Sequence, residues 1–208
     1  MITKQTRRWL IVIFIVGLVA YCLPWVVNRG SSLSFGAYDL AEWASLHPTV
    51  RGSNPALVTS LLLRLPLACF GIVIASTLWK QRPGWRIVFL LLVGIALLPP
   101  LEFFTQYRDD PNYQQQFALA VIAVLVGIFT LVMRSPKWIN VLSIVCAFIG
   151  SICGLLGLMQ SYNLMRGFEL ATQVGSGGIL FIILNVGIGT ILVYSSKQGR
   201  SYFTRTTL

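Results

Sequence analysis

The stretch ALVTSLLLRLPLACFGIVIASTLW, residues 56–79, decides the fold class of this chain. It is almost entirely apolar and carries one charged residue, Arg64. A helix needs roughly 20 residues to cross the ~30 Å hydrocarbon layer of a bilayer, because each residue advances the helix by ~1.5 Å. The stretch is therefore long enough to span a membrane as a helix, and it predicts that Arg64 lies within the membrane.

The composition of the whole chain is also typical of a membrane protein. Hydrophobic residues make up 56% of the 208 residues and charged residues only 11%, and the mean hydropathy is +0.76. An ordinary soluble domain contains roughly 25% charged residues and does not need so much apolar surface. We therefore predict an all-α integral membrane protein, a single bundle of transmembrane helices over residues 1–208.

Six apolar runs lie between charged or turn-rich stretches. These candidate spans cover residues 9–27, 56–79, 86–106, 112–133, 137–159 and 174–195. Three of them follow a capping side chain and a proline, a pattern that favours a helix start, at Asn54-Pro55, Asp110-Pro111 and Ser135-Pro136. The first run follows basic residues, as in a signal peptide. Because it exceeds the roughly 7–15 apolar residues of a signal peptide, we expect it to be a retained span.

Basic residues gather on one side of the predicted bundle. With six spans, one side of the membrane holds both termini and the loops near 80–86 and 134–137. Eleven of the sixteen basic residues fall there: Lys4, Arg7, Arg8, Lys80, Arg82, Arg86, Arg134, Lys137, Lys197, Arg200 and Arg205. The acidic residues and the long loop 28–55 fall on or next to the other side. Because basic residues are retained in cytoplasmic loops, we predict cytoplasmic termini in a multi-pass protein of the inner or plasma membrane.

The net charge of +10 follows from this topology. A nucleic-acid-binding protein gathers Lys and Arg on one soluble face with polar or aromatic partners. In this chain they are divided among short cytoplasmic segments, which attract anionic lipid headgroups. The lipid bilayer is therefore a predicted partner, and nucleic acid is not.

The outer loop 28–55 contains a short helical pattern that begins with GAYDLAEW, residues 36–43. Leu40, Trp43 and His47 recur at spacings of three and four and share one face, with Asp39 and Glu42 set apart from it. We predict a short interfacial helix that lies on the bilayer surface or caps the bundle, with Trp43 at headgroup level. The alternative is a lid that covers a ligand.

A shorter phrase in the last outer loop resembles this one. Tyr38-Asp39-Leu40-Ala41 aligns with Phe168-Glu169-Leu170-Ala171, so that aromatic, acid, Leu and Ala recur. An internal repeat of this kind would place matching interfacial caps on two helical hairpins, a parallel arrangement that some transporters have. A two-sided ligand lid and a chance match are the alternatives. Both the cap and the lid require Tyr38 and Phe168 to face the bundle.

Arg64 needs a partner, because a charge inside a span costs several kcal/mol unless it is paired or reaches the interface. Glu102, beyond Pro99-Pro100 at the outer end of the third span, is the expected partner. The structural interpretation is an Arg–Glu pair, or an arginine that extends outward to the interface. The functional alternative is that Arg64 contacts an anion or a substrate in an outward-facing cavity.

Small residues predict a close helix contact between the last two spans. Gly150 and Gly154 form a G-x-x-x-G pattern, and Gly157 lies a further turn along. Asn185 lies in the middle of the sixth span. Because glycines let backbones approach and an asparagine can bond across such a contact, we predict tight packing between spans five and six. An ion path through Asn185 is the alternative.

Residues for catalysis or cofactor binding are scarce. His47 is the single histidine, the cysteines lack zinc-type spacing, and no G-x-S-x-G or nucleotide-binding glycine pattern occurs. We therefore predict no catalytic residue, no metal and no cofactor. The favoured function is an accessory or structural subunit of a larger membrane complex, with other membrane subunits as partners.

Two other functions remain open from the sequence. One is a solute-binding or permease subunit with an outward-facing cavity near Arg64 and Glu102. The other is a membrane enzyme that acts on lipid, which would need two polar side chains to converge at headgroup depth. The sequence indicates no such pair.

Overall fold

The computed structural model describes residues 4–28, 33–77, 83–132, 135–167 and 171–205. The described elements follow in the order α1 (Lys4–Cys22), β1 (Val26–Asn28), β2 (Leu33–Phe35), α2 (Ala37–Leu46), α3 (Pro48–Arg51), α4 (Val58–Thr77), α5 (Pro83–Leu97), η1 (Leu101–Phe104), α6 (Pro111–Val132), α7 (Pro136–Arg166), β3 (Thr172–Val174) and α8 (Ser176–Arg205). The chain is mostly helical, as predicted. The three short strands are an addition that the all-α prediction did not include.

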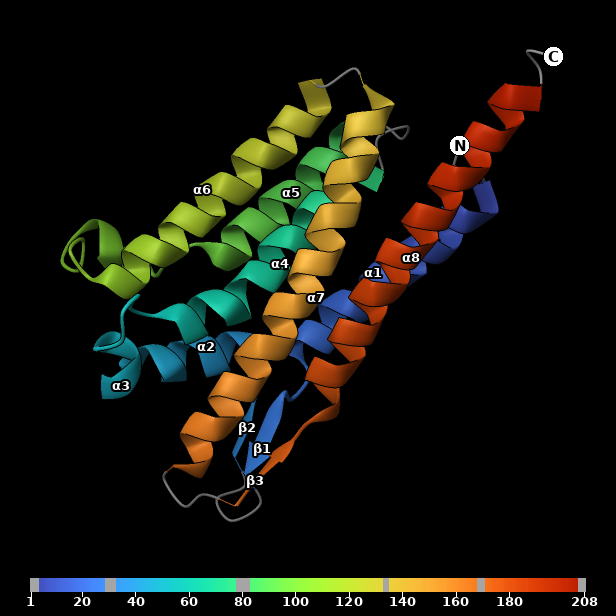
Figure 1. Ribbon diagram of the computed structural model, residues 1–208. Coiled ribbons are helices and arrows are strands. Elements are labelled where there is room, and N and C mark those ends of the chain that lie inside the picture. Colours follow the sequence, from blue (N-terminus) through green and yellow to red (C-terminus); the bar gives the residue numbers. More distant parts are fainter. Residues whose placement is uncertain (1–3, 29–32, 78–82, 133–134, 168–170, 206–208) are drawn as a thin grey trace.

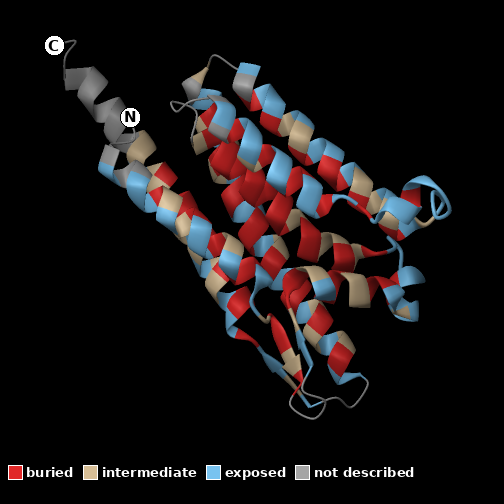
Figure 2. Cartoon of the chain, turned by 180° about the vertical axis from the view of Figure 1, so that it is seen from behind, coloured by how far each residue is buried: buried red, intermediate tan, exposed pale blue. Residues whose placement is uncertain are grey.

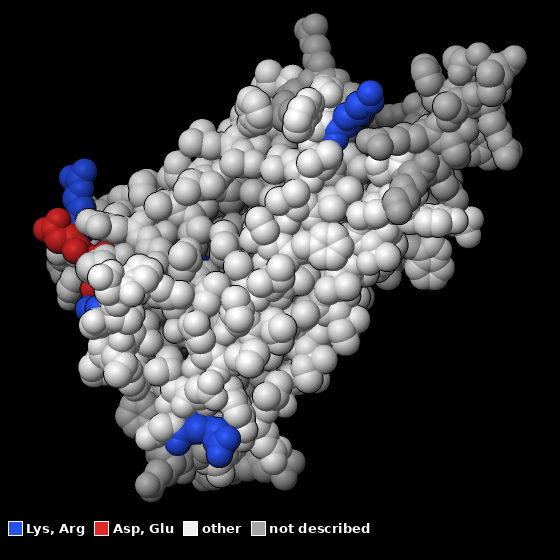
Figure 3. All heavy atoms as spheres, viewed as in Figure 1, with Lys and Arg blue, Asp and Glu red and all other residues white. Residues whose placement is uncertain are grey.

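Within the described residues, four helices are long and apolar enough to cross a membrane: α4, α6, α7 and α8. Shorter apolar segments lie in α1 and α5, at Arg8–Cys22 and Arg86–Leu97. Figure 3 shows that, on the face it presents, the coloured charged atoms gather near the ends, whereas the broad middle is uncharged. This distribution and these helix lengths are compatible with a membrane protein.

The sequences Asp110-Pro111 and Ser135-Pro136 mark helix starts, as predicted. Helix α6 begins at Pro111 and α7 at Pro136. The carboxylate of Asp110 accepts a 2.8 Å hydrogen bond from the backbone N–H of Asn112. That bond satisfies one of the first backbone donors of α6, which have no partner inside the helix.

Several predicted boundaries are wrong. The first span, predicted to end at residue 27, ends as helix α1 at Cys22, and the fifth, predicted at 137–159, continues as α7 to Arg166. Helix α4 begins at Val58 rather than directly after Asn54, because Leu57 has φ 58° and a left-handed residue cannot belong to a right-handed helix. The third span, predicted at 86–106, ends as an α-helix at Leu97, and only a 3₁₀ turn follows at Leu101–Phe104. The prolines at 99 and 100 explain this early end, because they lack the N–H groups that would continue the helix.

Helix α4 is the centre of the bundle. In its most apolar window 78% of the residues are buried, against 33–44% in α6, α7 and α8. It contacts α7, α6, α2, α5 and α1, and Figure 2 shows it almost wholly in the colour of buried residues. The stretch that decides the fold class is therefore also the helix on which the other elements pack.

The glycines of α7 bring that helix close to α4. A Cβ on Gly157 would lie 3.0 Å from the carbonyl carbon of Leu62, and one on Gly150 would lie 3.3 Å from the Cβ of Cys69. Gly154 also approaches both α4 and α8. The prediction assigned these glycines to the contact with the sixth span. Helices α7 and α8 do pack together, but the closest approach that the glycines permit is to α4.

Asn185 does not bond across the helix contact as predicted. It is fully buried in α8, and its Nδ2 donates a 2.9 Å hydrogen bond to the carbonyl of Phe181, one turn earlier in the same helix. Its Oδ1 is buried and has no hydrogen-bond partner in the described part of the chain. A short polar side chain in a helix often satisfies itself by bonding back to its own backbone in this way.

A small antiparallel sheet connects the segment between α1 and α2 with the segment between α7 and α8. Strand β1 lies between β2 and β3, with Val26 opposite both Phe35 and Val174. The sheet lies at the end of the bundle opposite the first turn of α1 and the last turns of α8 (Figure 1). Directly before β1, Trp25 is fully buried, and its indole N–H donates a 3.2 Å hydrogen bond to the carbonyl of Ala20.

The short helix predicted in segment 28–55 is present as α2. It packs against α4, so it caps the bundle, with Leu40 and Ala44 fully buried and Asp39 exposed. Tyr38 points into the bundle. The matching phrase cannot be compared residue by residue, because Phe168 and Glu169 lie outside the described residues.

Arg86 belongs to a helix rather than to a cytoplasmic loop. It lies in the first turn of α5 and is only 4% exposed. Its Nε donates to the carbonyl of Ala75 at 2.8 Å, and its Nη2 donates to the carbonyl of Thr130 at 3.3 Å. The guanidinium therefore binds carbonyls in the last turns of α4 and α6, where a cation is favoured by the helix dipole.

Substitution of two glycines in α8 tests the close contact of its first turn with the end of α1. A Cβ on Gly177 would lie 2.5 Å from the carbonyl oxygen of Leu23, whereas one on Gly187 would have no neighbour within 4 Å. We expect Gly177→Ala to lower the free energy of unfolding by about 1–3 kcal/mol, because backbone must move. Gly187→Ala should leave it unchanged or raise it by up to about 1 kcal/mol. Unfolding of the detergent-purified protein, followed by circular dichroism, measures both, and equal effects would contradict the contact.

Candidate functional site

The most polar buried place in the described chain surrounds Arg64. This residue is the seventh of α4, about 9 Å along the helix from its start at ~1.5 Å per residue. Its side chain is 0% exposed, so it does not extend to the interface. Because burial of an unpaired charge costs several kcal/mol, the stability of α4 depends on what binds this guanidinium.

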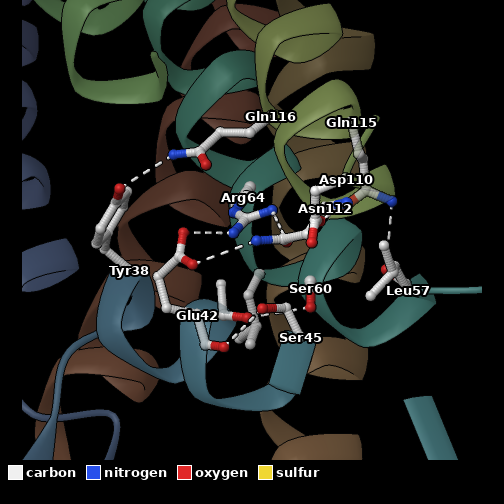
Figure 4. Close-up of polar contacts among 12 residues, drawn as sticks. Tyr38, Glu42, Ser45, Leu57, Ser60, Arg64, Asp110, Asn112, Gln115 and Gln116 are labelled. Atoms are coloured by element: carbon white, nitrogen blue, oxygen red, sulfur yellow. Dashed lines mark hydrogen bonds and ion pairs between the residues drawn. The ribbon is translucent and has the colours of Figure 1, made fainter. Parts of the chain in front are cut away.

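Two side chains from different elements bind Arg64. Its Nη2 lies 2.6 Å from Oε1 of Glu42 on α2, and its Nη1 donates a 2.8 Å hydrogen bond to Oδ1 of Asn112 on α6. The Nδ2 of Asn112 donates to the other carboxylate oxygen of Glu42 at 3.3 Å. The three side chains therefore form a closed triangle, which we call the Arg64 triad (Figure 4).

The triad is nearly neutral and partly solvated on one side. Arg64 and Asn112 are buried, whereas the Glu42 side chain is 32% exposed. The carboxylate balances the charge of the guanidinium, and both of its oxygens accept hydrogen bonds. Such charge-assisted bonds are short and strong. The Nε of Arg64 has no hydrogen-bond partner among the described residues.

Further hydrogen bonds hold α2 in place around the triad. The hydroxyl of Ser60 on α4 donates to the carbonyl of Ala41 at 3.0 Å. The Nε2 of Gln116 on α6 donates to the hydroxyl of Tyr38 at 3.0 Å. At the end of α3, an exposed ion pair joins Arg51 to Asp110 at 3.2 Å. Helix α2 is therefore attached to both α4 and α6 by polar contacts on one of its faces.

The predicted pairing of Arg64 with Glu102 is wrong. Glu102 is exposed in the 3₁₀ turn η1, and the carboxylate that binds Arg64 belongs to Glu42. The helical pattern of residues 36–47 predicts Glu42 on a different face from Leu40, Trp43 and His47. The structure shows that Tyr38, Glu42 and Ser45, which are four and three residues apart, face the neighbouring helices. Neither Glu102 nor Asn185 joins the triad.

Sequence reasoning missed Asn112 and Gln116, although a signal for them exists. Both lie in the first turns of α6 and are at most 3% exposed. They are four residues apart, so they share one helix face. A run of amides at the start of a helix that is apolar further on indicates polar neighbours inside the bundle: Asn112 bonds to Arg64 and Glu42, and Gln116 bonds to Tyr38.

A separate groove lies near α3, at the end of α7. Its volume is about 640 Å³, and it lies between the segment 47–59 and the last turns of α7. His47, an outer-loop candidate, lines it together with amide and hydroxyl side chains, but Arg64, Glu102 and Asn185 do not. In the described residues, no group of three or more His, Cys, Asp or Glu side chains could hold a metal ion.

Two glutamate substitutions distinguish the triad from the pairing that the sequence suggested. Glu42→Gln should lower the free energy of unfolding by about 3–5 kcal/mol, because it leaves the buried charge of Arg64 uncompensated. Glu102→Gln, which changes an exposed carboxylate in the same way, should change it by less than about 0.5 kcal/mol. Titration with a denaturing detergent in mixed micelles measures both. A larger effect from Glu102→Gln would show that the triad is wrong.

Comparison with known proteins gives no match to a protein-family model, to a curated protein or to a solved structure. Any function proposed for this chain therefore rests on the contacts, burial and charge of its own residues.

Proposed function

We propose that this chain is a six-span membrane protein with cytoplasmic termini that serves as a non-catalytic, accessory or structural subunit of a larger membrane complex. Its membrane would be the inner or plasma membrane. The six spans would be the four long apolar helices together with the shorter apolar segments of α1 and α5. The start of α1 and the end of α8 lie at the same end of the bundle, as an even number of spans requires (Figure 1).

The observation that carries the functional proposal is the Arg64 triad. A solute-binding subunit needs polar groups that are free to contact the solute. The buried guanidinium of Arg64 instead binds Glu42 and Asn112 of its own neighbouring elements. These contacts of α2 are therefore structural, because each of them attaches α2 to a neighbouring helix.

The permease alternative loses its main support for the same reason. It required a cavity near Arg64 and Glu102. The described groove lies elsewhere, and neither of these residues lines it. Of the outer-loop candidates that the structure describes, only His47 lines the groove.

The exposed faces of the helices support a role in assembly. Large apolar side chains are exposed along α5, α6, α7 and α8, for example Leu92 at 57%, Phe129 at 60% and Ile183 at 60%. In a membrane such side chains contact lipid or the helices of neighbouring subunits, which pack by van der Waals contact. A small bundle that is apolar on several sides therefore offers several faces to partner helices.

Co-purification tests the proposed role. We expect the tagged chain, extracted in mild detergent, to elute with at least one other membrane protein at a constant ratio, identified by mass spectrometry. Glu42→Gln should reduce this retention, because it loosens α2. A monodisperse chain that elutes alone with a bound small solute would support the permease alternative and would overturn the proposed role.

Accessibility of single cysteines tests the proposed orientation. In a variant without native cysteines, Arg108→Cys and Lys137→Cys place thiols at exposed positions beyond the two ends of α6, one before its start and one after its end. A membrane-impermeant maleimide added to intact cells should label position 108 and not position 137. Both should react after lysis. Labelling of position 137 alone in intact cells would reverse the orientation, and labelling of both would contradict a span between them.

A further inference from the structure

The groove between the segment 47–59 and α7 has an uncharged polar lining. None of its described lining residues is Lys, Arg, Asp or Glu. The polar side chains include two amides of α7, Gln160 and Asn163, and a third amide, Asn54, from the opposite wall. Its volume of about 640 Å³ lies within the roughly 300–1,000 Å³ of ligand-binding sites. The groove is therefore large enough to bind a ligand and is electrostatically suited to a neutral one.

The walls of the groove are fixed by hydrogen bonds. Thr59, which is 6% exposed, donates a 2.9 Å hydrogen bond to Oε1 of Gln160. This bond uses the carbonyl side of the Gln160 amide and leaves its NH₂ group as a donor. On the opposite wall the hydroxyl of Ser53 bonds to the carbonyls of Val50 and Pro55 at 2.9 and 3.0 Å. Hydrogen bonds therefore orient polar groups on both walls of the groove, on helix α7 and on the turn around Ser53.

The lining chemistry matches a polypeptide backbone. A side-chain amide carries both a donor and an acceptor, and it pairs with the N–H and C=O groups of a peptide bond. Apolar lining residues, Val50, Val58 and Leu164, lie among the amides. An extended chain presents backbone polar groups along its length and side chains alternately to two sides. The backbone of such a chain can bond to the amides of the groove while its side chains contact the apolar lining residues.

Other ligand classes fit this lining less well. A phosphate, a lipid headgroup or an acidic peptide would need a cationic side chain, and the described lining provides none. Sugar rings bind by stacking on aromatic faces as well as by hydrogen bonds. The one aromatic ring in the described lining is that of His47, which already packs against Trp43 at 6.0 Å between ring centroids.

We propose that this groove binds a short, extended and uncharged segment of a partner polypeptide on the outer side of the membrane. This inference rests on the proposed function, since the segment belongs to another subunit of the complex. Gln160 and Asn163 would contact the backbone of the segment, and Leu164 and Val58 would contact its side chains.

Photo-crosslinking tests the groove directly. The full chain is expressed with p-benzoylphenylalanine at position 163, irradiated in its native membrane and purified, and its adducts are mapped by mass spectrometry. We expect one crosslinked polypeptide, joined through an uncharged segment of its outer part. The same probe at Ile183, an exposed apolar position of α8, should not crosslink to that segment.

A synthetic peptide with the mapped sequence then separates specific binding from mere proximity. We expect Gln160→Ala to raise the dissociation constant of this peptide for the purified chain about tenfold, the equivalent of one lost hydrogen bond. Gln173→Ala, the same change at an exposed position of β3, should leave it unchanged. Equal dissociation constants for wild type and Gln160→Ala would overturn the inference.

The outcomes also separate this inference from the proposed function. If a partner co-purifies but position 163 yields no protein adduct, or a highly charged segment, the groove inference fails and the subunit role stands. If position 163 crosslinks only to a second copy of this chain, or to a glycan, the groove inference also fails. If no partner co-purifies and no adduct forms, both proposals fail.

Discussion

The buried cation Arg64 organises the end of the bundle that carries α2. Arg64 lies in the most buried helix of the bundle, and a guanidinium in an apolar interior is tolerated only with oriented acceptors around it. Glu42 and Asn112 are those acceptors, and they come from two different elements. The need to neutralise one charge therefore determines where α2 lies and how the start of α6 meets α4.

Steric contacts complement these polar contacts along α4. Beside Arg64, Gly157 of α7 approaches the backbone of Leu62, and nearer the centre of α4, Gly71 approaches α5. Close packing in a membrane depends on such small residues, because lipid supplies no hydrophobic drive for helix association. In the last turns of α4 a polar contact occurs again, where the buried Arg86 binds a backbone carbonyl. Shape and polar contacts therefore act together along the whole helix.

The helices could be predicted from the sequence because their signals are local. Apolar length identifies α4, and a capping residue before proline identifies the starts of α6 and α7. The predictions are wrong where a distant contact or a backbone conformation determines the structure. The left-handed Leu57 delays α4, and the choice of Glu42 over Glu102 depends on how α2 crosses α4. Strands of three residues cannot be recognised alone, because their stability comes from pairing across the chain.

The central position of β1 in the sheet has a consequence for how distant parts of the chain are held together. One edge of β1 pairs with β2, the next strand in the sequence, but its other edge pairs with β3, which lies between α7 and α8. The sheet therefore joins the segment after α1 to the segment before α8, and Trp25, directly before β1, packs against Phe181 of α8. The end of α1 is thus covered partly by a segment that is distant in the sequence.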